Sequence, residues 1–138
     1  MEVEPERRPN SPLDPEPQTG EVRQPTEEEI VEQIRRELLA IHRKSYGRGA
    51  ERVTAHLLGD TVIVLLDGLE LLPSEEFLIG SGEAEAVTGL RTQYQKAIEP
   101  TFRAVVERAT GRRVIGFSSH VSVEEPRFAA EIFRLGPS

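Results

Sequence analysis

Four consecutive residues of this chain have the right types to form a small anion site: Tyr46, Gly47, Arg48 and Gly49. Glycine N–H groups and a guanidinium group can together bind a carboxylate, bicarbonate or phosphate. The same residues also suit a structural role, because glycine commonly ends a helix in the left-handed conformation. A helix C-terminus repels anions, so the structural interpretation is favoured. Arg91 is the second arginine near which we expect an anion if this site exists.

A second glycine-rich segment, residues 80–83 (Gly-Ser-Gly-Glu), precedes a long helical pattern. Helix N-termini bind phosphate, so this segment is a candidate phosphate loop. However, no lysine follows it, no apolar strand directly precedes it, and Glu83 occupies the place of the anion. The pattern is neither a Walker loop nor a dinucleotide fingerprint, and we interpret it as a flexible helix cap.

The chain contains three histidines, His42, His56 and His120, and none has a metal-ligand neighbour at helical or strand spacing. A site made of His56, His120 and Asp67 would require three separate elements to converge, so exposed strand histidines are the favoured interpretation. Ser119 and His120 are adjacent in a predicted strand and therefore point to opposite faces, which separates a nucleophile from its base. We predict no catalytic residue, no metal site and no cofactor.

A loose acidic run, made of Glu70, Glu75, Glu76, Glu83 and Glu85, could face a cationic partner. Runs of this kind are more often the solvated surface of a helix, and that is our interpretation.

The composition limits the class of protein. The chain has 138 residues, a formal net charge of −7 and no cysteine. This charge argues against a nucleic-acid binder, and the lack of cysteine excludes disulfides, thiolate zinc sites and cysteine nucleophiles. The longest apolar run, residues 61–66, is far shorter than the roughly 20 residues that span a bilayer, so we expect no membrane insertion and a cytoplasmic location.

Residues 1–25 differ in kind from the rest, since they hold six of the ten prolines and almost no large apolar side chains. Such a segment buries too little surface to offset the entropy of ordering, so we predict a disordered Pro/Glu-rich tail. Residues 26–138 are predicted to form one domain.

The elements of this domain follow from periodicity and breakers. Thr26, with glutamates after it, predicts the start of a helix that ends near Gly47, and two strands follow, residues 53–58 and 61–66. Pro73 predicts a short helix. The last two strands are predicted at residues 113–123 and 128–135.

Between the two strand pairs lies the longest helical pattern, from residue 81 to Gly111. One apolar stripe is predicted along it: Val87, Leu90, Tyr94, Ala97, Ile98, Phe102, Val105 and Ala109. Pro100 should kink or split this helix. The predicted fold class is α+β: a two-layer sandwich whose four-stranded antiparallel sheet, made of two hairpins, carries one long and one or two shorter helices on one face.

With these elements placed, the chain resembles the MpsC-type domain, a bacterial family of small cytosolic proteins named for a Na⁺-translocating, membrane-potential-generating system. The resemblance covers roughly residues 27–135, and Ala50 departs from it where the family often has proline. It rests on residues 46–49, 53–67 and 72–75, Gly82-Glu83, Arg91, Glu99-Pro100 and residues 110–114. It implies an accessory or regulatory role near ion or bicarbonate transport, exerted through a membrane transport protein as partner, and supplies no catalytic mechanism.

The leading hypothesis is therefore a non-enzymatic cytosolic domain that acts through protein–protein contacts as a homodimer. Residues 128–133 are apolar on both faces, which suggests that this last strand is an exposed edge at which two copies pair. The alternatives are a small-anion sensor that binds near Arg48 or Arg91 and, less favoured, a hydrolase of unknown substrate.

Overall fold

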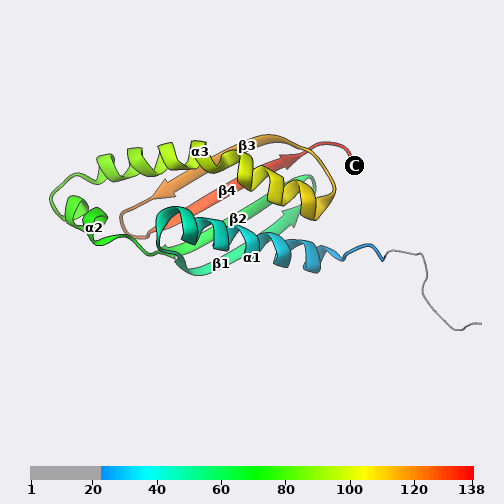
Figure 1. Cartoon of the computed structure of the whole chain (residues 1–138), viewed down its shortest axis with the longest axis horizontal. Coiled ribbons are helices and arrows are strands. Elements are labelled where there is room, and N and C mark those ends of the chain that lie inside the picture. The colour runs from blue at the N-terminus through cyan, green and yellow to red at the C-terminus, as the bar shows by residue number, and fades with distance from the viewer. Residues whose placement is uncertain (1–22) are drawn as a thin grey trace, which may run out of the picture.

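The computed structural model describes residues 23–138 and has the predicted α+β architecture, with three helices in front of one four-stranded sheet (Figure 1). In chain order the elements are α1 (Glu27–Tyr46), β1 (Ala50–Leu58), β2 (Thr61–Leu69), α2 (Pro73–Gly80), α3 (Ala84–Thr110), β3 (Val114–Ser122) and β4 (Phe128–Leu135). The predicted N-terminal tail lies, up to residue 22, outside the described residues. In the part that is described, no helix combines the length and the hydrophobicity needed to cross a bilayer.

Helix α1 begins and ends where the sequence predicted. The Glu29 N–H donates to the Thr26 hydroxyl over 3.1 Å, and the Thr26 N–H donates to the Glu29 carboxylate over 2.9 Å. This reciprocal capping box satisfies two N–H groups that the first turn leaves free. At the other end, Gly47 adopts a left-handed φ of 76° and its N–H donates to the Arg43 carbonyl. Ile34 and Leu38, both fully buried, fix the face that α1 packs on the sheet.

The sheet has the order β1-β2-β4-β3, and all neighbouring strands are antiparallel. Strand β4 is thus hydrogen-bonded on both sides, and the prediction that it forms an exposed pairing edge is wrong. It carries apolar side chains on both faces because it lies in the middle of the sheet. The edge strands are β1 and β3.

Helix α3 is continuous through Pro100, so a split at this proline does not occur, and Figure 1 shows a bend near its middle. The predicted apolar stripe is correct at Val87 but wrong at Leu90 and Tyr94. Leu90 and Tyr94 are 49% and 44% exposed, whereas Arg91 and Gln95 are 3% and 8% exposed. From Phe102 toward the N-terminus of the helix, the buried positions continue at helical spacing through Gln95 and Arg91. Two polar residues therefore lie in the core.

Candidate functional site

The buried polar residues of the described chain gather in one place. They are His42, Glu75, Arg91, Gln95 and Glu131. Together with Tyr46, which touches three of them, we call these residues the polar cluster. A buried polar group costs free energy unless it is paired, so five such groups in one small domain require an explanation.

An ion pair between α2 and α3 forms one end of the polar cluster. Arg91 donates to both carboxylate oxygens of Glu75, from Nε over 2.8 Å and from Nη2 over 2.9 Å. The Leu72 N–H donates to the same carboxylate over 2.8 Å. Burial acts to raise the pKa of Glu75, but the hydrogen bonds and charge of Arg91 outweigh it, and the pKa of Glu75 is lowered. Glu75 is therefore not the solvated helix surface that the acidic run suggested.

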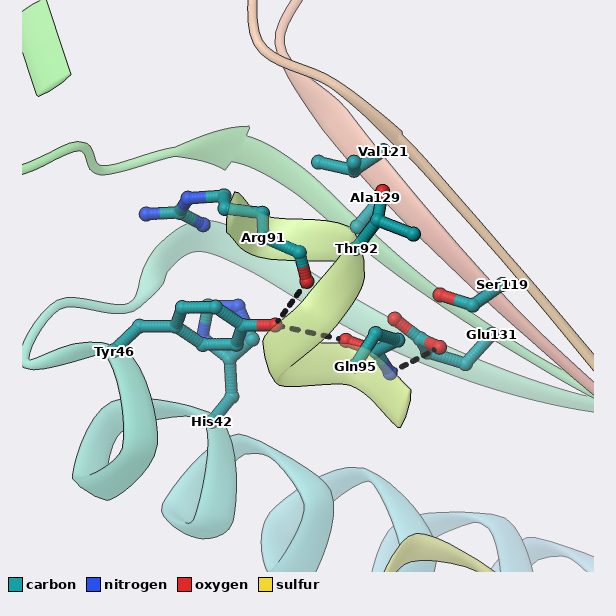
Figure 2. A pocket seen from close by; sticks show the side chains of 9 residues that line it. All are labelled: His42, Tyr46, Arg91, Thr92, Gln95, Ser119, Val121, Ala129 and Glu131. Atoms are coloured by element: carbon teal, nitrogen blue, oxygen red, sulfur yellow. Dashed lines mark hydrogen bonds between the residues drawn. The ribbon is translucent and has the colours of Figure 1, made fainter. Parts of the chain in front are cut away.

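Tyr46 links this ion pair to the sheet. Its ring lies against the guanidinium of Arg91, with Cζ 4.6 Å from the ring centroid. Its hydroxyl donates to Oε1 of Gln95 over 2.9 Å, and Nε2 of Gln95 donates to Oε1 of Glu131 over 2.7 Å, as Figure 2 shows. Burial is the main reason that the pKa of Tyr46 is raised to about 12. The hydroxyl stays protonated at neutral pH and sets the orientation of the Gln95 amide.

Glu131 projects from the central strand β4 toward the helices and is 1% exposed. Burial raises the pKa of this carboxyl to about 8, although the Ser119 hydroxyl opposes the rise. At pH 7 the carboxyl is therefore mostly protonated and neutral, and it can donate a hydrogen bond as well as accept the one from Gln95.

His42 lies at the other side of the polar cluster, with its ring centroid 4.5 Å from that of Tyr46. Burial, helped by the charge of Arg91, lowers the pKa of His42 to about 4, so the ring is neutral at pH 7. Its Nδ1 is buried and has no hydrogen-bond partner within the described part of the chain. The polar cluster thus contains a buried ring nitrogen that no group of the described chain pairs with.

A cavity of about 40 Å³ lies between these groups (Figure 2). His42, Tyr46, Gln95 and Glu131 border it on the buried side, and Thr92 and Ser119, both exposed, border it on the solvent side. One water needs about 10–15 Å³ of such volume, so the cavity has room for two or three water-sized groups. Arg91 also lines the cavity, so a guanidinium borders it together with carboxyl, amide and hydroxyl groups. Within residues 23–138, no three His, Asp or Glu side chains converge on a metal site.

The structure brings together only part of the predicted anion site. Tyr46 and Arg91 are in contact, but the Arg91 charge is already paired with a carboxylate. The Gly49 N–H donates to the Glu70 side chain over 3.2 Å, which occupies one of the amides expected to bind an anion. The side chain of Arg48 is exposed. Anion binding near these arginines stays a prediction.

The remaining sequence candidates lie apart. His56 and His120 are exposed on the two outermost strands, in different rows of the sheet and three strand spacings apart, so they are more than about 14 Å from each other. Ser119 faces the cavity, whereas His120 points to the opposite side of the sheet, as the strand alternation predicted. Glu83 precedes α3 as its N-cap and makes no side-chain cap hydrogen bond.

Sequence reasoning missed the functional candidates at Glu131 and Gln95. A signal was present in both cases. Glu131 is in phase with Phe133 and Leu135, which alternation places on the buried face of a strand. Gln95 follows Arg91 by four residues, which places both on one face of a helix.

Comparison with known families gives one match. The family model described as "Na+-translocating membrane potential-generating system (MpsC)" matches residues 26–135. The comparisons with curated proteins and with solved structures gave no match.

Proposed function

Because the chain belongs to the MpsC family, we propose that it is a non-enzymatic accessory domain of an ion-translocating, membrane-potential-generating system and that it acts through protein contacts as a homodimer. The family description supplies the association with a Na⁺-translocating system. The proposal places the domain in the cytoplasm, with a membrane transport protein as the further partner.

The observation that carries the proposal is the face of the sheet opposite the helices, which we call the open face (Figure 1). Four positions on each strand lie on it. In order across β1, β2, β4 and β3 its rows are Arg52-Asp67-Phe128-Ser122, Thr54-Leu65-Ala130-His120, His56-Ile63-Ile132-Ser118 and Leu58-Thr61-Arg134-Gly116.

The centre of the open face is apolar. Ile63 and Leu65 from β2 adjoin Ile132 and Ala130 from β4, and none of these four residues belongs to the core under the helices. Ile132 is 38% exposed. A sheet that packs on only one side normally carries polar residues on its other face, so apolar central rows mark a contact surface.

The charges on the open face suit a second copy of the chain. Asp67 lies beside Arg52 in the row at one end, and Arg134 lies in the row at the other end. A two-fold axis between two facing sheets, perpendicular to the strands, places the Asp67 row of one copy opposite the Arg134 row of the other. The same axis stacks the row that contains Ile63 on the row that contains Leu65. A single arrangement therefore brings opposite charges together and buries the apolar side chains.

The size of the open face sets the expected affinity. Its sixteen positions are fewer than the roughly 20–30 residues per side of a standard interface. We therefore expect a small interface and a dimer whose population depends on protein concentration.

Light scattering and sedimentation over about 1–200 µM protein test the proposal. The chain should pass from monomer to dimer with rising concentration, and Ile132→Glu should keep it monomeric because a charge would be buried at the centre of the interface. Leu90→Glu is the matched control, since Leu90 is also exposed but lies on α3, away from the open face. A monomer at all concentrations, or equal effects of the two variants, would refute the open face as the dimer interface.

A further inference from the structure

We propose that the free edge of strand β1 binds an extended, basic segment of the membrane transport partner, which adds to the sheet as a fifth strand. Strand addition of this kind is a common mode of peptide recognition, in which main-chain hydrogen bonds supply much of the affinity. The inference rests on the proposed function for the identity of the partner. It concerns the edge of the sheet and not the open face, so it can fail while the homodimer stands, and the reverse.

The main-chain groups on the outer side of β1 have no partner within residues 23–138 (Figure 1). The hairpin of β1 and β2 turns through two residues, which makes the residues that flank the turn a hydrogen-bonded pair. Such pairs recur at every second residue, so the N–H and C=O groups of Ala55 and Leu57 point away from β2. The Gly68 N–H donates to the Arg127 carbonyl on the β4 side of β2, as this alternation requires.

The other outer strand, β3, is protected where β1 is not. A bulge between Val114 and Gly116 interrupts its ladder with β4. The Val114 N–H donates to the Glu107 carboxylate over 2.9 Å, and the Val114 carbonyl accepts from Arg103 over 3.1 Å. Bulges and covering side chains are usual means of blocking strand addition at an edge. Strand β1 keeps one register with β2 from Arg52 to Leu58, so it is the edge open to a further strand.

Helix α1 forms the second wall of a groove along this edge. Two adjoining hollows of about 230 and 280 Å³ lie between α1 and β1, and they share four lining residues: Glu28, Val31, Ala55 and His56. Val31 and Ala55 are half-buried and make the floor of the groove apolar. The groove follows β1 over residues 54–58. This length, about 15 Å, corresponds to roughly five residues of an extended chain.

The charge of the groove favours a basic occupant. Glu27 and Glu28 line it, are exposed, and form no ion pair within the described part of the chain. Arg35, which also lines the groove, donates to both carboxylate oxygens of Glu32, over 2.9 and 2.8 Å. The groove therefore keeps an excess of negative charge, which lysine or arginine side chains would complement.

The same charge distinguishes among possible occupants. A second copy would bring the same acidic side chains to the shared edge, and residues 1–22 also carry more acidic than basic side chains. The cytoplasmic loops of membrane proteins, in contrast, carry an excess of Lys and Arg. A docking segment should place an apolar side chain beside Val31 and basic ones within reach of Glu27 and Glu28. These side chains should alternate along the segment, since alternate residues of a strand face the same side.

A synthetic peptide with blocked ends, Thr-Lys-Thr-Val-Thr-Lys-Thr, provides the probe. As a strand it directs Lys, Val and Lys to one side, and it reads the same in both directions, so it suits parallel and antiparallel addition. Titration of the full chain into the labelled peptide, followed by fluorescence anisotropy, should show binding that weakens as salt is raised, because the paired charges are exposed. The same peptide with glutamate in place of lysine should bind at least about tenfold more weakly.

The double variant Glu27→Lys/Glu28→Lys tests the groove itself. It should reverse the preference, so that the glutamate peptide binds more tightly than the lysine peptide. The matched control is Glu83→Lys/Glu85→Lys, since these two glutamates are also exposed at the N-terminal end of a helix but belong to α3. Ile132→Glu, which should abolish the homodimer, should still bind the lysine peptide. The failure of one proposal is thereby separated from the failure of the other.

Hydrogen exchange, followed by NMR in the wild-type chain, gives a measurement that needs no variant. The N–H groups of Ala55 and Leu57 should exchange faster than those of Thr54 and His56, which bond to β2. Lysine peptide at ten times its Kd should slow the exchange of Ala55 and Leu57 by about tenfold.

Three results would each overturn the proposal: no binding of the lysine peptide at about 1 mM, equal binding of the glutamate peptide, or no slowing of exchange at Ala55 and Leu57. Protection of these two N–H groups that rises with protein concentration, without peptide, would also overturn it and assign the edge to a second copy.

Discussion

The pH dependence of stability offers the sharpest test of the buried carboxyl, and Glu131→Gln is the perturbation. Glutamine keeps the shape of the side chain and still accepts the hydrogen bond from Nε2 of Gln95, but it does not titrate. The pKa of Glu131 is raised from 4.5 to about 8 in the folded chain. The folded state therefore holds this proton more tightly, and the stability that it contributes is full below pH 4.5 and is lost as pH rises toward 8.

His42 acts in the opposite direction, and it defines the useful pH window. Its pKa is lowered from 6.5 to about 4, so folding loses stability as pH falls from 6.5 toward 4. Between about pH 4.5 and 6.5 the two effects oppose each other. Above pH 6.5 the histidine is neutral in the folded state and increasingly neutral in the unfolded state, so the slope due to Glu131 dominates.

The magnitude follows from that window. From pH 6.5 to pH 8 the unfolded chain has lost the Glu131 proton, while the folded chain keeps most of it at first and half of it at pH 8, so the slope starts at about 1.4 kcal/mol per pH unit and declines. Because the slope falls to half at pH 8, the 1.5-unit interval costs the wild type about 1–2 kcal/mol of unfolding free energy. Glu131→Gln should be nearly flat over the same interval.

Urea unfolding at constant ionic strength provides the assay. The chain has no tryptophan, so far-UV circular dichroism is the suitable signal. A loss of about 1–2 kcal/mol corresponds to a fall in the urea midpoint of roughly 0.5–1 M. Parallel pH profiles for the wild type and Glu131→Gln would refute the assignment of a buried, protonated carboxyl.

Two further predictions concern the connections around the polar cluster. Arg91→Met leaves Glu75 buried without its partner and should cost about 3–5 kcal/mol of unfolding free energy in urea, because an unpaired buried charge is expensive. The double variant Glu75→Gln/Arg91→Met should recover part of that loss, and additive single effects would show that the two residues do not interact. Gly47→Ala should cost about 1–2 kcal/mol through its φ of 76°, since the added Cβ meets only an ordinary contact 3.7 Å from Leu72. A loss above about 3 kcal/mol in the same assay would mean that more than backbone strain is involved.

Local chemistry in the chain determined most of the fold. Thr26 and Gly47 mark the two ends of α1. Each acts through hydrogen bonds and backbone geometry within one helical turn, so its effect does not depend on the rest of the chain. The antiparallel hairpin of β1 and β2 and the α+β class were likewise predictable, since strand alternation and turn residues are adjacent in sequence. The family match also agrees with the resemblance seen in the sequence motifs.

Tertiary structure decided the order of the strands and the inner face of α3. The insertion of β4 between β2 and β3 depends on pairing between segments far apart in the chain, which local patterns do not encode. The same pairing makes Glu131 an interior residue, and the rotation of α3 turns Arg91 and Gln95 inward in place of Leu90 and Tyr94. Which side chains are withdrawn from water depends on contacts among all the elements at once. For that reason the sequence could predict the helices and strands of this protein, while the polar cluster emerged only from their packing.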